Sequence, residues 1–286
     1  MGFTNIHNYV DCLNGGRAVV GNFRKVPGLA SVANWWSDLS MAAGNPPAQY
    51  FAAAPGISTF AGLGKFDGLF HGDNKSPSEL YLAGMMLVTP TAAMVGQYTL
   101  LDYLMYYPFV DLDDNSAAQP MTQVATLPRY ADGIGVQAML VAQAPTTGGG
   151  SFTFTYLNEL GVEHTSPENY FTATGANMGA IVTSQPAGQA GLGPYLMIAS
   201  GDKGITQITG HTNIISNGGL GAYVLVKPLA DIVVSEINTP NEVTLVSARP
   251  GPPRIYDGAF LNFICNTAGS IQAGLLTGRL NFVWTG

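Results

Sequence analysis

Two segments of the chain carry nearly the same turn motif, and this repeat limits the possible folds more than any other feature. Residues 128–133 read PRYADG and residues 253–258 read PRIYDG. An apolar segment follows each motif, over 136–141 in one case and 259–265 in the other. Because these segments are short, apolar and bounded by turn residues, we expect both to be β-strands.

The likeness continues on both sides of the motif. Downstream, each strand reaches a turn of small residues and then a second expected strand with an aromatic residue near its end. Upstream, LMYYPFVDL resembles VLVKPLADI, and GDNK resembles GDK. The segments concerned are 152–156 and 280–284, 104–112 and 224–232, and 72–75 and 201–203. The offsets are 125 positions for the turn motif, 120 for 104–112 and 129 for 72–75, and they differ only as loop insertions would make them differ. The sequence therefore predicts an internal duplication, although Pro and Asp-Gly also mark turns in unrelated β proteins.

Turn signals between short strands, at intervals of about 8–12 residues, are typical of β-sandwiches and jelly rolls. We therefore expect an all-β chain of two tandem, related β-sandwich or jelly-roll domains, over 48–165 and 166–286. Pro108 and Pro228 lack an N–H, so each should end its strand or lie at a sheet edge. The Asp-Gly pairs of the two motifs should turn the chain into the next strand.

Residues 1–47 look different and are expected to form a partly helical N-terminal arm. Residues 29–43 could be an amphipathic helix, because five apolar positions share one helical face. They are Leu29, Val32, Trp36, Leu39 and Ala43. Such a helix would pack on its own domain or dock on a neighbouring subunit.

Charged residues make up only 10% of the 286 residues, against about 25% in an ordinary soluble domain. A surface with so little charge is poorly protected against association, so we expect an obligate oligomer. The alternative is an extracellular domain with a surface of Ser, Thr, Asn and Gly. The net charge of −7 and the lack of any basic cluster beyond Arg24-Lys25 argue against direct binding of nucleic acid.

Two features bear on the compartment. Cys12 and Cys265 lack metal or disulfide spacing and are expected to be buried thiols. The N-terminus shows no secretory signal. Residues 80–101 and 169–201 lack charge, but their Gly and Pro residues favour strands and turns over membrane spans, so no membrane partner is expected.

The search for chemistry predicts no catalytic residue, no cofactor-binding residue and no metal ligand. No two of the four histidines lie within four residues of each other, and nucleotide-binding and nucleophile-elbow motifs are absent. The acidic run 111–115 departs from a calcium loop and is expected to be a solvated turn. Glu163-His164 and His71-Asp73 are charged neighbours that only weakly suggest acid–base chemistry. The repeated carboxylates Asp73/Asp202, Asp111/Asp231 and Asp132/Asp257 fall at predicted turns, where Asp caps its own backbone.

The densest ring cluster is Tyr103, Tyr106, Tyr107 and Phe109. Strand alternation would place 103, 107 and 109 on one face and 106 on the other. We expect these rings to belong to the core rather than to an exposed sugar-binding platform.

The C-terminal part of the chain resembles structural proteins of tailed-bacteriophage virions. The resemblance rests on four segments: 201–204 (GDKG), 225–229 (LVKPL), 253–263 (PRIYDGAFLNF) and 282–284 (FVW). It covers about 90 residues directly and residues 66–157 only through the repeat. It implies a non-enzymatic virion protein that is assembled in the host cytoplasm.

Within that class, the first hypothesis is a capsid decoration (cement) or minor capsid protein, a homotrimer that binds a capsid protein. The second is the major capsid protein, which is disfavoured because no long charged helix is visible. The third, a different class, is a carbohydrate-binding double β-sandwich.

Overall fold

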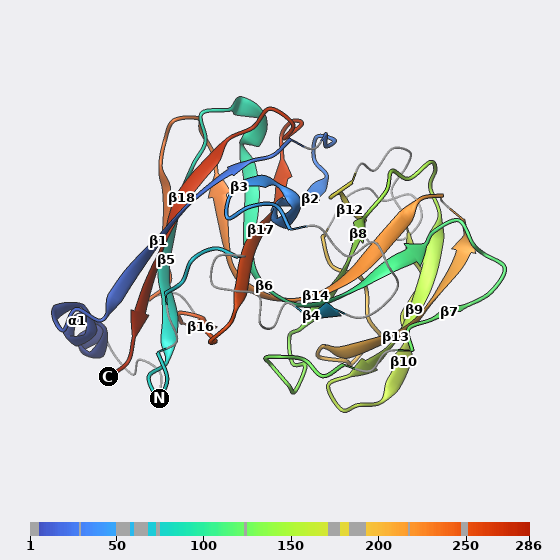
Figure 1. Cartoon of the computed structure of the whole chain (residues 1–286), viewed down its shortest axis with the longest axis horizontal. Coiled ribbons are helices and arrows are strands. Elements are labelled where there is room, and N and C mark those ends of the chain that lie inside the picture. The colour runs from blue at the N-terminus through green and yellow to red at the C-terminus, as the bar shows by residue number, and fades with distance from the viewer. Residues whose placement is uncertain are drawn as a thin grey trace.

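The computed structural model describes residues 6–28, 30–49, 58–59, 68–72, 75–122, 125–170, 178–182, 193–216, 218–246 and 251–286. The fold is all-β: the described residues form one α-helix, α1 (Ile6–Asn14), two short 3₁₀ helices, and strands in three antiparallel sheets (Figure 1). Asp73 and Leu29, which the sequence singled out, lie outside the described residues. Among the described residues, no helix combines the length and apolarity that crossing a membrane requires.

The first outer sheet contains strands from both ends of the chain. Its order is β15 (Asn241–Thr244), β5 (Leu80–Val88), β18 (Leu276–Trp284), β1 (Ala18–Val26) and β3 (Ala43–Asn45), and β16 (Arg254–Ile255) also pairs with β5. The second outer sheet has the order β10 (Glu163–Thr165), β9 (Ser151–Asn158), β13 (Ile205–Ile215) and β7 (Gln119–Pro120), and β11 (Asn169–Tyr170) also pairs with β9.

The central sheet joins the two lobes. Its order is β12 (Ile181–Val182), β8 (Gln137–Ala142), β14 (Leu220–Val234), β6 (Gly96–Asp111), β17 (Phe260–Thr267) and β2 (Trp36–Asp38), and β4 (Ser58–Thr59) also pairs with β6. The two longest strands, β6 and β14, run through both lobes (Figure 1).

The central sheet closes into a six-stranded barrel. Ser37 of β2 forms an antiparallel bridge with Ala180, which directly precedes β12. The Asp38 N–H donates to the Gly179 carbonyl at 2.8 Å. One cluster of buried residues draws on all six strands and fills the interior; examples are Trp36, Tyr103 and Ile181. The barrel therefore has no free edge over the described residues, which removes the usual risk of edge-to-edge pairing.

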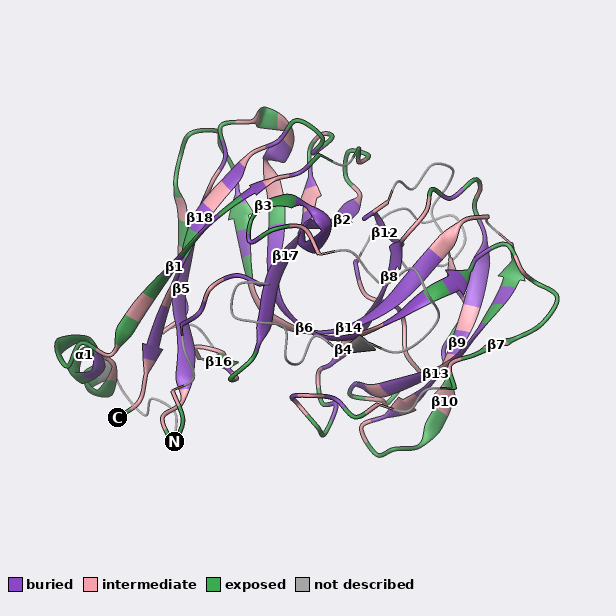
Figure 2. Ribbon diagram, viewed as in Figure 1, coloured by how far each residue is buried: buried purple, intermediate pink, exposed green. Residues whose placement is uncertain are grey.

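Each outer sheet packs on the outside of the barrel. The first outer core includes Phe23, Leu280 and Phe282 from the first outer sheet, and Leu100 and Phe263 from the barrel. The second outer core includes Phe152, Phe154, Tyr156 and Ile208 from the second outer sheet, and Tyr107 and Tyr223 from the barrel. Figure 2 shows the buried residues running along these strands, with exposure at turns and on α1. The expected sandwich packing is confirmed, and the two sandwiches share one barrel.

The strands expected around the repeated motifs are confirmed as β8, β9, β17 and β18. The Asp-Gly turns also form as expected: the Gly133 N–H bonds to the Tyr130 carbonyl and the Ala259 N–H to the Tyr256 carbonyl. Gly133 and Gly258 have φ of 67° and 74°, a region in which a side chain is strained.

Neither proline ends its strand: Pro108 is in β6 and Pro228 is in β14. The alternative, a sheet edge, agrees with the pairing, because over the described residues each proline lies where its strand is paired on one side only. The pairing of β14 with β8 stops at Val226, and the pairings of β6 with β17 and β4 stop at Tyr103 and Tyr106. Pro108 also lies within a register shift of the β6–β14 ladder, and another shift follows Pro228. A proline at such a position can lack its N–H without losing a ladder hydrogen bond.

The helix expected over 29–43 is also wrong, although the N-terminal arm does contain a helix, α1. Residues 36–38 form β2, and a 3₁₀ turn, η1 (Leu39–Met41), follows it. The Asp38 carboxylate caps this turn by accepting the Ser40 N–H at 2.8 Å. Pairing of β2 with β17 and burial of Trp36 inside the barrel outweigh the helical spacing.

The expected boundaries at residues 47 and 165 stay a prediction. Sheet boundaries do not coincide with them, because each sheet takes strands from both sides of residue 165. Both cysteines are free and buried, as predicted.

Candidate functional site

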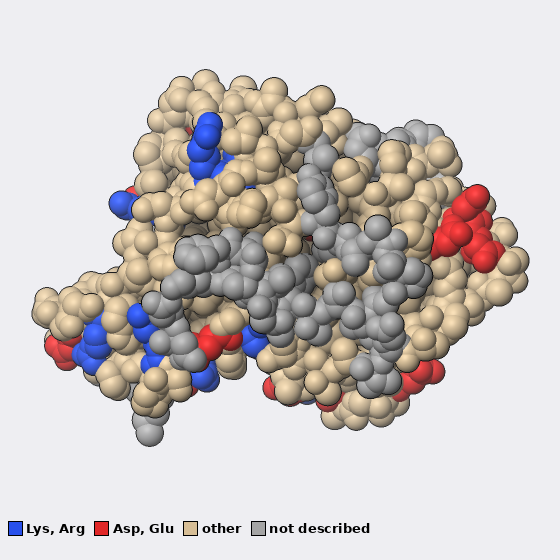
Figure 3. Space-filling view, in the orientation of Figure 1, with Lys and Arg blue, Asp and Glu red and all other residues tan. Residues whose placement is uncertain are grey.

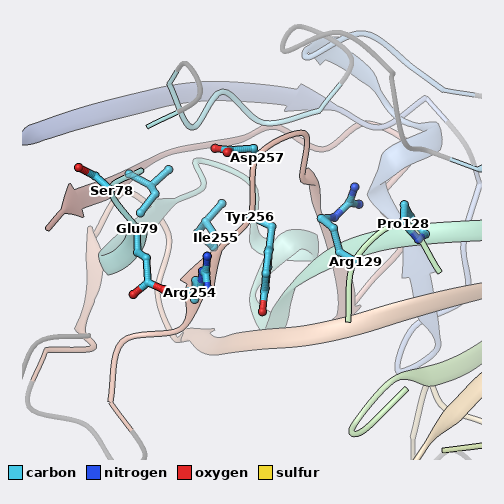
Figure 4. A pocket seen from close by; sticks show the side chains of 9 residues that line it. Ser78, Glu79, Pro128, Arg129, Arg254, Ile255, Tyr256 and Asp257 are labelled. Carbon is cyan, nitrogen blue, oxygen red and sulfur yellow. Dashed lines mark ion pairs between the residues drawn. The ribbon is translucent and has the colours of Figure 1, made fainter. Parts of the chain in front are cut away.

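The two repeated turn motifs lie against each other on the outside of the barrel and line a pocket of about 180 Å³ (Figure 4). The rings of Tyr130 and Tyr256 meet edge to face, with 4.8 Å between centroids. The lining residues are Ser78, Glu79, Leu80, Pro128, Arg129, Arg254, Ile255, Tyr256 and Asp257. The sequence suggested the likeness of the motifs but gave no sign that they touch.

Arg129 is the buried cation of this pocket. Its Nε and Nη2 donate to the two carboxylate oxygens of Asp102 at 2.8 and 2.7 Å. The guanidinium also donates to the carbonyls of Tyr103 and Gly258, at 2.9 and 3.0 Å. Burial raises the pKa of Asp102 to about 6, against the opposing effect of Arg129. Arg129 thus fixes the first motif to β6 and to the entry of β17.

Arg254 occupies the same position of the second motif but is more exposed to solvent. Its Nη1 is 2.8 Å from Glu79 Oε1, with side chains 43% and 22% exposed. The guanidinium stacks on the Tyr256 ring at 4.5 Å. The Tyr81 hydroxyl donates to the other Glu79 oxygen at 2.6 Å, which lowers the pKa of Glu79.

The charged side chains that line the pocket are therefore already engaged. Arg129 and Arg254 are each paired with a carboxylate, and Asp257 accepts the Lys75 N–H at 3.4 Å. These ion pairs and hydrogen bonds link neighbouring strands. We assign the pocket no catalytic role.

The weak acid–base candidate Glu163-His164 is not brought together as a pair. His164 Nδ1 lies 2.8 Å from Asp202 Oδ2, while Glu163 pairs with Leu157 across the strands. The Tyr156 hydroxyl and the Asn158 amide also donate to the Asp202 carboxylate. Burial acts to raise the pKa of Asp202, but these hydrogen bonds together hold it below its usual value. The cluster anchors the loop before β13 to β9.

His71 is a core histidine. Its Nε2 lies 3.0 Å from the Ala259 carbonyl, so this nitrogen carries the proton and donates. Its ring meets Phe282 edge to face, and burial lowers its pKa.

The acidic run 111–115 is a turn that binds its own backbone, as expected. Asp111 Oδ1 accepts the N–H groups of Asp113 and Asp114, and Asp114 Oδ1 accepts from Ser116. Among the described residues, no group of three His, Cys, Asp or Glu side chains is arranged to hold a metal ion.

The capping role expected for all the repeated carboxylates is only partly right. Asp132 accepts the Ile134 N–H at a turn. Asp231 instead lies within β14 and accepts a hydrogen bond from the Thr99 hydroxyl across the sheet. The register continues through this position, so Asp231 ends no strand.

The core assignment of the ring cluster is confirmed for Tyr103 and Tyr107, which are fully buried; Phe109 is 38% exposed. The predicted alternation is wrong. Tyr103 and Tyr106 pack inside the barrel and Tyr107 packs in the second outer core. A register shift in the β6–β14 pairing next to Tyr103 reverses the faces.

Sequence reasoning missed a buried polar group at the barrel wall. Lys25 is fully buried, and its Nζ donates to the carbonyls of Ala42 and Pro46, both at 3.0 Å. Burial lowers its pKa to about 8. Asp38 accepts the Tyr103 hydroxyl at 2.6 Å. No spacing rule marks these residues, because their partners come from distant strands.

No family model matches this chain, and no curated protein sequence matches it. Solved structures of infectious bursal disease virus align with most of it. The structure of the Gt strain covers 94% of this chain and 81% of its own, with 10% identity and a TM-score of 0.19. The VP2 subviral particle covers 93% and 80%, with 9% identity and a TM-score of 0.16. Scores this low carry no argument about fold or function.

Proposed function

We propose that the chain is a structural protein of a virus particle and, within that class, a capsid decoration (cement) or minor capsid subunit of a tailed bacteriophage. The scarcity of charge carries the proposal. Only 29 of 286 residues are Lys, Arg, Asp or Glu. Several of these take part in the buried contacts described above and do not contribute charge to the surface. Figure 3 shows uncharged residues over most of the described part of the visible face, with charge in small separate groups.

The distribution of exposed apolar side chains supports subunit contacts on more than one side. Large apolar residues are exposed on α1, on both outer sheets, on the barrel strands β6 and β14, and on the loops and turns between strands. They are Val10, Leu13, Val20, Val32, Phe109, Ile134, Leu160, Val162, Ile214, Ile215, Val233 and Ile237. They are spread over several elements rather than gathered on one, which fits a subunit surrounded by neighbours better than one binding a single ligand.

The role is architectural rather than enzymatic, and the assembly is a homotrimer seated on a capsid protein within the virion. Burial of uncharged surface would supply the association energy, at about 25 cal/mol per Å² before the costs of association. Three chains, each with two related β units, would present six similar units to a capsomer.

Light scattering on the purified full chain over a wide concentration range tests the assembly. We expect the mass of a trimer that persists on dilution. A monomer at high concentration would remove the main support for a shell subunit. Cryo-electron microscopy of the native particle then tests the position, since a decoration protein must lie outside a complete shell formed by another chain.

A further inference from the structure

We propose that the two halves of the chain, residues 18–158 and 163–284, are two copies of one unit that folds only by exchanging strands with a second copy. In this chain the two halves exchange strands with each other, so each half serves as the second copy for the other. The proposal is independent of the virion role, because it rests on sheet order and register alone.

If each strand is replaced by its counterpart in the other half, the strand order of the first outer sheet becomes that of the second outer sheet. The first half contributes β1, β2, β5, β6, β7, β8 and β9, and the second contributes, in the same sequence, β10, β12, β13, β14, β15, β17 and β18. Replacing each strand by its counterpart turns the order β15-β5-β18-β1 into β7-β13-β9-β10, which is the order of the second outer sheet. The same replacement returns the central sheet to itself, read from the other end.

The registers agree to the residue. Met85 pairs with Leu280 in the first outer sheet, and Gly210 pairs with Thr155 in the second, an offset of 125 positions (85 to 210 and 155 to 280). In the barrel, the Cys265/Tyr98 pair corresponds at the same offset to the Leu140/Tyr223 pair.

One pair lies on the two-fold axis that this exchange implies. Asp102 pairs with Lys227, and the offset of 125 positions carries each of them onto the other. On the opposite wall, Ser37 bridges to Ala180 where β2 meets its counterpart β12. The repeated motifs touch because they flank this axis.

All ladders between these fourteen strands join one half to the other. Over the described residues, none of the seven strands of a half pairs with another of the same seven. Within the first half, only the short strands β3 and β4 pair with strands of the same half, β1 and β6. A half on its own would therefore leave most N–H and C=O groups of its strands without partners, at a cost that a core cannot offset. The partner that fits this surface is a second copy carrying the same strands.

The contact between β18 and β1 is the counterpart of the turn between β9 and β10. The Asn158 N–H donates to the Val162 carbonyl at 3.0 Å, where β9 turns into β10, and the Trp284 N–H donates to the Arg17 carbonyl at 3.2 Å, where β18 meets β1. Residues 159–162 thus connect the two halves along the chain. Leu160 in this turn is 77% exposed, so the connection can be changed without touching a core.

Deleting residues 158–162 from the full chain tests the proposal. Leu157 would then join Glu163 directly, and because these two residues pair across the ladder, the chain could not reverse between β9 and β10 without breaking that pairing. We expect each half to pair with the opposite half of another molecule, which doubles the mass relative to the parent in light scattering and keeps its far-ultraviolet circular dichroism. A control variant in which six Gly/Ser residues lengthen the same turn should keep the parent mass. A deletion variant with the mass and stability of the parent would overturn the proposal.

A second measurement decides the case in which the deletion variant does not fold. A protease site placed between Leu160 and Gly161 of the full chain allows the folded protein to be cut. The halves, separated in urea, should each fail to refold as a monomer and should regain the native spectrum when mixed one to one. If either half refolds alone as a monomeric β domain, strand exchange is not required and the proposal fails.

Discussion

At the scale of single residues, Arg129 and Arg254 show how one motif serves two environments. Both follow a proline and precede an aromatic segment with Asp-Gly. Arg129 forms a buried ion pair in the pocket between the two motifs, where the Arg129 and Asp102 side chains are 5% and 1% exposed. The Arg254–Glu79 pair is open to solvent. The sequence alone could identify the likeness but not this difference, because burial depends on which strands cover each arginine.

We expect Arg129→Ala to lower the free energy of unfolding by about 3–5 kcal/mol, because it leaves the buried Asp102 without its counter-charge. Arg254→Ala is the matched control, and we expect a loss of no more than about 1 kcal/mol for this exposed pair. Urea denaturation of the two variants and the parent measures both. Equal losses would contradict the assignment of Arg129 as the buried member.

His211 makes stability depend on pH. Asn213 donates its amide to the carbonyls of Asp111 and Asp114, so its oxygen faces His211 Nε2 at 2.8 Å and accepts from it. Nδ1 therefore accepts from the Tyr223 hydroxyl, at 2.6 Å. Both nitrogens are satisfied in the neutral ring, and burial lowers the pKa of His211 to about 4.

Since the unfolded chain has the higher histidine pKa, about 6.5, it takes up the proton first as pH falls. We expect the free energy of unfolding to decrease by up to about 3 kcal/mol between pH 6.5 and pH 4 from this residue, with no contribution above pH 6.5. His71, whose pKa burial also lowers, acts in the same direction. His211→Gln should flatten the slope, and His7→Gln on the exposed side of α1 should leave it unchanged. Denaturation series at several pH values measure the slope, and an unchanged slope in His211→Gln would refute the assignment.

At the scale of elements, strand positions were predictable and strand irregularities were not. Apolar runs ended by Asp-Gly or glycine-rich turns located β8, β9, β17 and β18. The bulges that absorb Pro108 and Pro228 depend on the register between β6 and β14, which no local pattern encodes. The spacing that suggested a helix over 29–43 reflects instead Trp36 and Leu39 pointing into two different cores.

Barrel closure depends on Gly179, whose φ of 86° places its carbonyl against the Asp38 N–H. We expect Gly179→Ala to cost about 1–2 kcal/mol through the left-handed backbone and to speed hydrogen exchange at the Asp38 amide. Gly161→Ala is the control: its φ is 71°, so the strain is similar, but it lies far along the chain in the turn between β9 and β10. Gly161→Ala should leave hydrogen exchange at the Asp38 amide unchanged. Fast exchange at Asp38 in the parent protein would mean that the barrel is open.

At the scale of the whole molecule, two lobes with separate outer cores share the strands β6 and β14. Neither lobe can lose its core without disturbing these strands, so the lobes are thermodynamically linked. The pocket between the two repeated motifs was not predictable, because it lies where two segments more than a hundred positions apart in the chain meet.

We expect a single unfolding transition in calorimetry, with calorimetric and van't Hoff enthalpies in agreement. Phe154→Leu in the second outer core and Phe282→Leu in the first should each shift this one transition downward. Two resolved transitions, each moved by only one of the variants, would show that the lobes unfold independently.

The pairing of β1 with β18 sets how the molecule responds to a pull on these two strands. Ala18, at the start of β1, pairs with Val283, near the end of β18. A pull applied between these two ends therefore opens the ladder like a zipper, one hydrogen-bonded pair at a time, rather than shearing all pairs together. Load carried across the faces of the barrel, by contrast, is shared by many bonds at once. The fold therefore resists pressure on the faces of the barrel and yields to a pull that separates β1 from β18.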